Sequence, residues 1–94
     1  LKKMSGEQSY LRFEDNKICV TFDLIKDNAS NSFMNEIDQL CLKYNILPSV
    51  IKDSRLPKSI FEKTYKFANE FRENLCKFDK KRIYKSEVSR RLEI

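Results

Sequence analysis

The side chains best placed to do chemistry in this chain stand together at residues 51–55, in the order Ile-Lys-Asp-Ser-Arg. A short apolar segment, Ile46 to Ile51, precedes them, and a helical pattern begins after them near Pro57. Junctions between a strand and a helix commonly present functional groups to a ligand. This junction would present three charged groups and a hydroxyl. The alternative is that Asp53 and Arg55 only solvate a turn.

A second candidate lies in the segment from Lys17 to Ile25, where apolar and polar residues alternate. If its apolar side chains face the helices, Cys19 looks the other way, flanked two residues on either side by Lys17 and Thr21. A thiol between an amine and a hydroxyl is more typical of a pocket wall than of a core. The alternative is an inert, partly covered side chain. The other two thiols, Cys41 and Cys76, fall on apolar helix stripes, and we interpret them as packing residues.

The composition of the 94 residues excludes several kinds of site. There is no His, so no imidazole serves as a base or as a metal ligand, and no metal site is predicted. The three cysteines form no C-x-x-C pair and suit a reducing cytoplasm. A single glycine, Gly6, excludes glycine-rich phosphate loops. No apolar run is long enough to span a membrane. Because the chain begins at Leu1 without Met, we expect a fragment of a longer protein.

In the first half of the chain, the alternation of residue types predicts two strands, Ser9–Glu14 and Lys17–Ile25. Asp15-Asn16 is a suitable turn, so the two strands should form a β-hairpin. Helical spacing then predicts a helix from Phe33 to Tyr44. We expect Asn31 or Ser32 to cap its start and Asn45 to end it in a left-handed conformation.

In the second half, Ile46 to Ile51 is predicted as a short strand. The apolar spacing after Pro57 continues to Phe78 without an obvious break, which indicates one long or kinked helix. Asp79 to Arg82 should form a polar turn, and Ser86 should cap a last short helix, Glu87 to Leu92. The predicted class is α+β, with helices packed on one face of a small, mostly antiparallel sheet.

The residues also carry a resemblance to a known family. Residues 51–56 and 86–92, together with Phe61, Tyr65, Phe71 and Asp79, resemble the C-terminal end of the decaprenylphosphoryl-β-D-ribose oxidase family of FAD-linked oxidoreductases. Residues 18–22 are similar to the strand that carries that family's pocket cysteine, and residues 1–2 resemble the strand before it. The resemblance extends over nearly the whole chain.

The resemblance implies a two-domain flavoenzyme of the vanillyl-alcohol-oxidase type. Residues 1–94 would be the C-terminal part of its substrate domain, and FAD would be bound mainly by a domain of the same protein that is absent from this chain. Members of the family oxidise a sugar hydroxyl by hydride transfer to flavin. The 94 residues alone should therefore be inactive.

The resemblance also assigns roles to residues. Lys52 falls on the lysine at the flavin and the substrate, where a fixed cation stabilises negative charge near the flavin N1–C2=O edge. Cys19 falls on the thiol of the substrate pocket, and Lys2 on a second pocket lysine. Lys17 and Ser49 stand where relatives often carry asparagine and tyrosine, so the substrate is a sugar or polyol of open identity. Asp53 and Arg55 would fix the turn that aims Lys52. Lys66 and Lys80 replace prolines common in the family, so its helix break after Tyr65 is expected to be lost.

A different class of function is an independent basic module that binds an anionic partner such as nucleic acid. The chain has a formal charge of +5, and its C-terminal part is rich in cations: Lys77, Lys80, Lys81, Arg82, Lys85, Arg90 and Arg91. Acidic residues interrupt this run, and no RNA-binding aromatic motif accompanies it. A third interpretation is a purely structural α+β domain.

Overall fold

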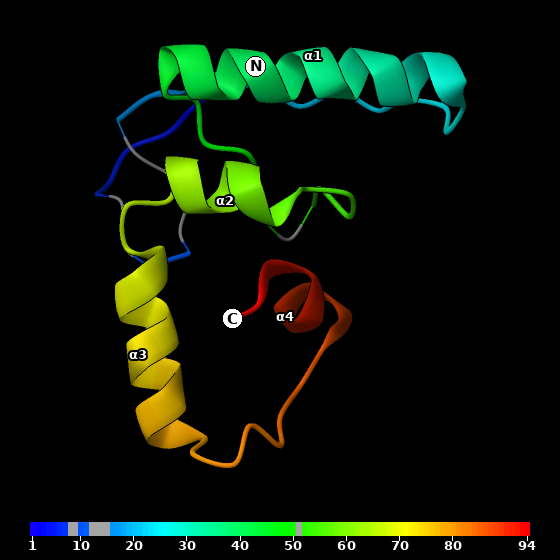
Figure 1. Cartoon of the computed structure of the whole chain (residues 1–94). Helices are drawn as coiled ribbons and strands as arrows, with labels where there is room; N and C mark the ends of the chain where they lie inside the picture. The colour runs from blue at the N-terminus through cyan, green and yellow to red at the C-terminus, as the bar shows by residue number, and fades with distance from the viewer. Residues whose placement is uncertain (8–9, 12–15, 51) are drawn as a thin grey trace.

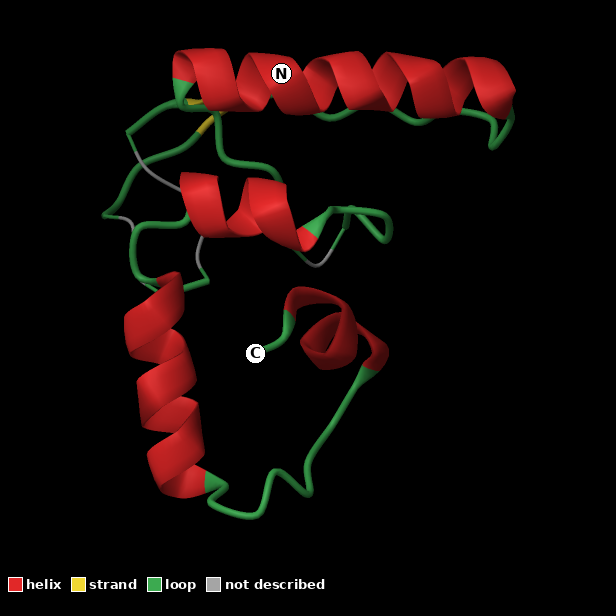
Figure 2. Cartoon of the chain, in the orientation of Figure 1, coloured by secondary structure: helices red, strands yellow, loops and turns green. Residues whose placement is uncertain are grey.

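The computed structural model of the chain describes residues 1–7, 10–11, 16–50 and 52–94 (Figures 1 and 2). In these residues it has four helices and a two-stranded antiparallel sheet, which confirms the α+β class in its coarse form. The elements in chain order are β1 (Lys2–Lys3), β2 (Ile18–Cys19), α1 (Asn28–Tyr44), α2 (Lys58–Thr64), α3 (Ala68–Phe78) and α4 (Glu87–Leu92).

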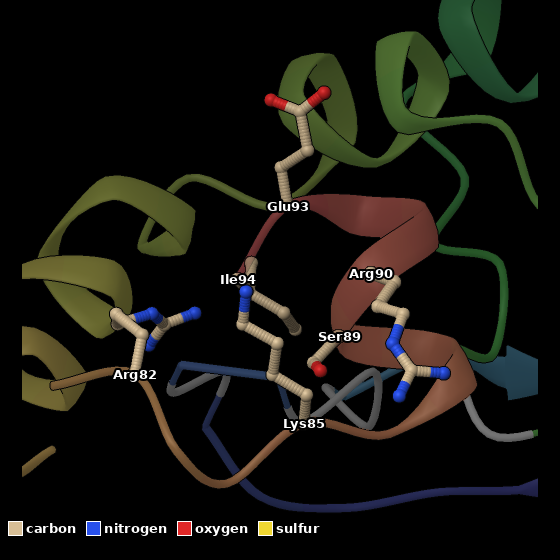
Figure 3. Close-up of a pocket in the computed structure, with 6 residues that line it drawn as sticks. All are labelled: Arg82, Lys85, Ser89, Arg90, Glu93 and Ile94. Atoms are coloured by element: carbon tan, nitrogen blue, oxygen red, sulfur yellow. The ribbon is translucent and has the colours of Figure 1, made fainter.

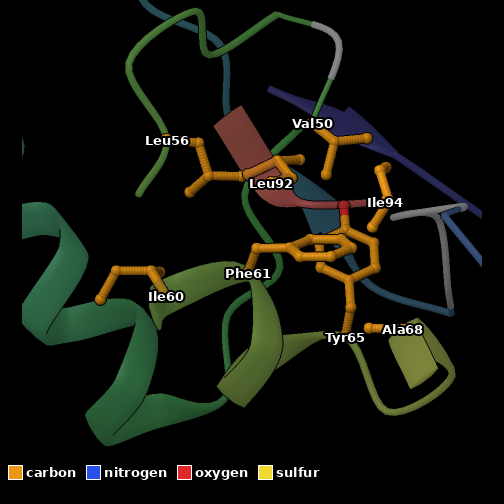
Figure 4. Packing of buried hydrophobic residues seen from close by; sticks show 8 residues of the cluster. All are labelled: Val50, Leu56, Ile60, Phe61, Tyr65, Ala68, Leu92 and Ile94. Carbon is orange, nitrogen blue, oxygen red and sulfur yellow. The ribbon is translucent and has the colours of Figure 1, made fainter. Parts of the chain in front are cut away.

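Helix α2 lies at the centre of the molecule and contacts α1, α3 and α4 (Figure 1). The apolar core gathers around it and includes the C-terminal residues of the chain (Figure 4). Its buried members are Val50, Leu56, Ile60, Phe61, Tyr65, Ala68, Leu92 and Ile94. The prediction that the helices cover one face of a sheet is therefore wrong in the described part of the chain, because this core lies among helices and loops.

Helix α1 begins earlier than predicted. Asp27 is its N-cap: the Asp27 carboxylate accepts the Ser30 N–H at 2.7 Å, and the Ser30 hydroxyl accepts the Asp27 N–H at 3.0 Å. This reciprocal pair satisfies backbone donors that a helix start leaves open. The residues expected to cap the helix, Asn31 and Ser32, lie inside it instead. The predicted end is confirmed, because Asn45 has φ 53° and closes the helix in the left-handed region.

The one long or kinked helix predicted after Pro57 is two separate helices. The chain leaves the helical conformation at Tyr65, which has φ −96° and ψ 97°. Its ring is only 1% exposed, packs against Phe61, and its hydroxyl donates to the Pro48 carbonyl. Burying this side chain in the core ends α2, and α3 starts at Ala68 in a new direction (Figure 1). The helix break is therefore present although Lys66 stands where the family often has proline.

The sheet is much smaller than predicted. Lys2 pairs with Cys19 and Lys3 with Ile18, so β2 pairs with the start of the chain rather than with the expected hairpin partner. Most of that partner, residues 9 and 12–14, and Asp15 of its turn lie outside the described residues. The strand was predicted to extend to Ile25, but residues 20–25 are not in a strand.

The strand predicted for residues 46–51 is also absent from its described part, residues 46–50. The last helix, in contrast, is confirmed. Ser86 caps α4, since its hydroxyl accepts the Ser89 N–H at 3.1 Å and the Ser89 hydroxyl accepts the Ser86 N–H at 2.8 Å. Asp79 to Arg82 is a turn, as predicted.

The C-terminal residues are fastened to the centre of the molecule by cations. Arg72 of α3 donates through Nε to the Glu93 carbonyl at 2.8 Å and through Nη2 to the Leu92 carbonyl at 3.0 Å. Arg91 donates to the Leu56 carbonyl. The two Arg72 bonds satisfy carbonyls at the C-terminal end of α4, and the Arg91 bond ties α4 to the residue that precedes α2. The docking of α4 places Leu92 in the core beside the turn that carries Lys52.

Candidate functional site

The turn that carries Lys52 is held by its own polar groups. The Asp53 N–H donates to the Ser49 carbonyl at 3.0 Å, and the Lys52 N–H donates to the Ser49 hydroxyl at 3.2 Å. On the other side of the turn, the Asp53 carboxylate accepts the Arg55 N–H at 3.1 Å, and the Asp53 carbonyl accepts the Leu56 N–H at 3.2 Å. Asp53 therefore closes the turn on both sides, and Leu56, which follows the turn, is buried in the core.

Arg55 anchors this turn to α1. Its guanidinium donates to both carboxylate oxygens of Asp38, through Nη1 at 3.0 Å and through Nη2 at 2.7 Å. Nη2 also donates to the Met34 carbonyl at 3.0 Å. Such a two-pronged pair fixes direction as well as distance. The interpretation that Arg55 only solvates a turn is wrong, and the geometry supports the hypothesis that Asp53 and Arg55 fix the turn.

The environment of this ion pair also explains the state of a neighbouring thiol. Burial raises the pKa of Asp38 and outweighs the opposing effect of Arg55, while the Asp53 charge raises it further. Burial likewise raises the pKa of Cys41, and the negative charges of Asp38 and Asp53 add to the effect. A buried thiol with a raised pKa is a poor nucleophile. The Cys41 side chain therefore packs, as predicted, whereas the same interpretation is wrong for Cys76, which is exposed near the end of α3.

Lys52 itself stands at the surface of this braced turn. Its residue is exposed, and its ammonium makes no hydrogen bond or ion pair with any residue the structure describes. The hydrogen bonds that hold the turn are made by backbone groups and by the side chains of Ser49, Asp53 and Arg55. The neighbours of Lys52 thus fix the backbone from which it projects, and the described residues leave its charge free for a ligand.

Three of the other predicted site residues meet at the small sheet. Lys2 and Cys19 are directly opposite each other in the antiparallel pair, so their side chains share a face. Lys17 lies two residues before Cys19 and has the same orientation in an extended chain. The Cys19 sulfur contacts the Thr21 hydroxyl at 3.9 Å, which places that residue on this face too. An open hollow of about 690 Å³ borders the strands, with Lys2 and Lys17 in its lining.

The predicted site is therefore found in two groups. Lys2, Lys17 and Cys19 come together on the sheet, and Ser49 and Lys52 come together on the turn. In the described part of the chain, no hydrogen bond or ion pair joins the two groups. The structure assembles each group but does not by itself close a pocket around both.

One residue of the site was missed by the sequence analysis. Asp38 lies four residues after Met34 and three before Cys41, in the middle of the stripe that α1 buries. An acidic residue at such a position needs a cation beside it, because an unpaired buried charge is costly. That position was the available signal, and it would have pointed to Arg55 or another basic residue as the partner.

A further basic cavity of about 320 Å³ lies near the C-terminus (Figure 3). Its lining residues are Arg82, Lys85, Ser89, Arg90, Glu93 and Ile94. The Glu93 carboxylate is bound by Lys58, and this hydrogen bond lowers the pKa of Glu93. Arg91, counted in the basic run, is occupied by Glu87 and by the Leu56 carbonyl. The cavity therefore keeps three cations of that run.

Comparison with protein-family models, with curated proteins and with solved structures finds no match to this chain. Within the described residues, no helix combines the length and the apolar character needed to cross a bilayer. The same residues contain no cluster of three or more Cys, Asp or Glu side chains able to hold a metal ion.

Proposed function

We propose that this chain is the C-terminal substrate-domain segment of an FAD-dependent oxidoreductase that oxidises a sugar or polyol hydroxyl by hydride transfer to flavin. The observation that carries the proposal is the exposed Lys52, presented by a turn that the Arg55–Asp38 pair ties to α1. The turn lies in residues 51–56, one of the two ranges in which the family resemblance is strongest.

The residues present fit one part of FAD and not the other. A fixed cation suits the pyrimidine edge of the flavin ring, where negative charge accumulates on reduction. The pyrophosphate of FAD needs backbone N–H groups in a close-fitting loop, and the chain has only one glycine. The proposal therefore assigns the phosphates to an FAD-binding domain of the same protein, and the ring edge to Lys52.

Each of the candidate site residues then has a definite role. FAD, when bound, supplies the acceptor for the hydride. Lys52 brings a positive charge to the flavin edge from a turn whose backbone is already fixed, so little backbone reorganisation is needed when charge develops. Lys2 and Lys17 can donate hydrogen bonds to hydroxyl oxygens, and the Ser49 hydroxyl keeps its hydrogen as a donor because it accepts from the Lys52 N–H. Cys19 lies beside Lys2 and Lys17 on the sheet.

A second candidate function is binding of an anionic partner such as nucleic acid. The observation that favours it is the convergence of Arg82, Lys85 and Arg90 on one cavity. Phosphate contacts would make such binding weaken steeply as salt rises. A mobility shift of mixed DNA or RNA by the chain, lost at high salt and reduced by Arg82→Ala with Lys85→Ala, would support this function over the oxidoreductase.

The proposed function is tested on the longer protein that contains these residues. We expect the purified protein to show the visible absorption of oxidised flavin, and we expect that absorption to bleach without oxygen when an oxidisable sugar or polyol is added. The 94-residue chain alone should bind no FAD. A longer protein that carries no flavin, even when it is refolded with excess FAD, would overturn the proposal.

A further inference from the structure

The segment from Val20 to Ile25 has the sequence of a strand but lacks a strand partner. Its side chains alternate, and the apolar ones remain widely exposed, with 60% of Val20, 44% of Phe22 and 47% of Leu24 open to solvent. No backbone N–H or C=O of residues 20–25 makes a hydrogen bond with any described residue. Unpaired backbone and exposed apolar surface in one segment indicate an interaction edge.

The conformation of this segment suits pairing. Figure 1 shows it running along α1 from the small sheet toward the first turn of the helix, and the Phe22 and Phe33 rings are in contact with centroids 5.8 Å apart. Residues 20–25 form no helix or turn, and the chain bends at Lys26 and Asp27, just before α1 begins.

The register of the existing pairs says which residues a continuation of β1 would be opposite. Lys2 is opposite Cys19 and Lys3 is opposite Ile18, so the numbers of paired residues add up to 21. Continued without a bulge, this register sets Val20 opposite Leu1 and Thr21 opposite the residue just before Leu1. Ile25 would then be opposite the fifth residue before Leu1. A partner strand in this register would be a direct continuation of β1.

We propose that, in the longer polypeptide, the five residues before Leu1 continue β1 as an antiparallel strand along Thr21–Ile25. The inference rests on the part of the proposed function that makes this chain the end of a longer protein. It deepens that function, because pairing within the plane of the sheet leaves the face with Lys2, Lys17 and Cys19 open. The lengthened sheet becomes a wall that carries those three side chains.

The alternation of the ladder sharpens the proposal. The Met4 N–H donates to the Lys17 carbonyl at 2.8 Å, so Lys17 turns its backbone groups toward β1. In an antiparallel ladder every second residue does the same. Thr21, Asp23 and Ile25 therefore turn their N–H groups toward the new strand, whereas Val20, Phe22 and Leu24 turn theirs to the opposite edge.

The side-chain pattern of the missing strand follows as well. The second and fourth residues before Leu1 would be opposite Phe22 and Leu24, on the face that packs toward α1, so we expect them to be apolar. The third residue would be opposite Asp23, where a cation or an amide suits the carboxylate. Proline or a charged residue at both the second and the fourth positions would overturn the proposal without any measurement on flavin.

The direct test adds a designed strand, Thr-Val-Thr-Val-Thr, before Leu1 and measures amide hydrogen exchange. We expect exchange at Thr21, Asp23 and Ile25 to slow by about tenfold or more, with little change at Val20 and Phe22. A matched control carries one extra serine between the same strand and Leu1, which shifts the register by one residue and should remove the protection.

Three results would overturn the proposal. They are unchanged exchange in a chain whose α1 amides remain protected, equal slowing on both edges, and slowing that depends on protein concentration, which would make a second copy the partner. If the 94-residue chain does not hold its helices alone, the same amides are measured in the longer protein, where slow exchange at Thr21, Asp23 and Ile25 is expected. Because these hydrogen-exchange measurements do not require bound FAD, a negative result would overturn the strand pairing without overturning the proposed function.

Discussion

The contact between Arg55 and Asp38 should contribute more to the free energy of unfolding than most polar contacts in the molecule. Asp38 is 5% exposed, and the side chain of Arg55 is 27% exposed. Removing one partner of a fully buried pair costs about 3–5 kcal/mol, because the other charge stays buried alone. Since Arg55 is partly solvated, we expect Arg55→Ala to lower the free energy of unfolding by about 2–3 kcal/mol. A domain of this size has only about 5–14 kcal/mol in total.

The assay is urea denaturation followed by circular dichroism, arranged as a double-mutant cycle with Asp38→Ala. We expect a coupling energy of about 1–3 kcal/mol between the two sites. Arg55→Lys keeps the charge but loses the two-pronged geometry, so it should recover only part of the stability. Arg90→Ala is the control for loss of a surface arginine, with an expected cost of about 0.5 kcal/mol or less. An Arg55→Ala cost equal to that of Arg90→Ala, or a coupling near zero, would refute the reasoning.

The same pair gives a pH dependence whose sign follows from Asp38. Its pKa is raised in the folded state, so the folded protein binds this proton more tightly than the unfolded chain does. Arg55→Ala removes the interaction that lowers this pKa, and the pKa should rise further. The deficit of the variant should therefore shrink as the pH falls from neutral toward the raised pKa of Asp38. Urea denaturation of both proteins at several pH values measures this difference in the free energy of unfolding. A difference that grows on acidification would contradict the interaction between Arg55 and Asp38.

Three further outcomes are expected. A thiol reagent should modify the exposed Cys76 first, the half-buried Cys19 next, and Cys41 only after urea unfolds the chain; early labelling of Cys41 would contradict its packing. Leu92→Ala should lower the free energy of unfolding by about 2–5 kcal/mol in urea denaturation, because the side chain is fully buried, and a cost near zero would place α4 outside the core. Asp79→Ala should speed hydrogen exchange at the two backbone amides that the carboxylate accepts. Burial raises the pKa of Asp79, but those N–H donors outweigh it and lower the pKa overall, so its stabilising contribution should be present at neutral pH and lost in acid.

Local signals in the sequence were reliable where one residue decides the conformation. Asn45 was predicted to end α1 in the left-handed region, and Ser86 to cap α4; both are confirmed. The start of α1 was missed because its first turn is polar and lacks the apolar spacing that marks a helix. The pair Asp27 and Ser30 was the available signal, since serine three residues after an acidic cap can return its hydrogen bond.

Apolar spacing was less informative where tertiary packing decides. Residues 57–78 keep a helical pattern throughout, yet the chain turns at Tyr65 because the core accepts that ring and Pro48 accepts its hydroxyl. The strand pattern of Lys17–Ile25 likewise shows what the segment can do, but a strand also requires a neighbour, and only Ile18–Cys19 has one. The periodicity of a segment does not tell which other segment will pair with it.

The candidate site was predicted in part for the same reason. The residues of the turn are adjacent in sequence, so Lys52 and its neighbours Asp53 and Arg55 could be identified together. The carboxylate that holds the turn, Asp38, is 17 residues away from Arg55 and becomes its neighbour only when α1 packs on α2. The assignment of Lys52 to flavin stays a prediction.

The measurement that tests this account most directly is single-turnover flavin reduction, with Lys52→Ala, in the longer protein that the proposed function requires. FAD content is measured first, and we expect it to match that of the unaltered protein, because Lys52 does not hold the phosphates. We then expect the reduction rate to fall by about 10- to 1,000-fold, the range found when a group that stabilises developing charge is removed. Unfolding in urea should be unchanged, since Lys52 is exposed. A variant that binds FAD and is reduced at the normal rate would contradict the role of Lys52.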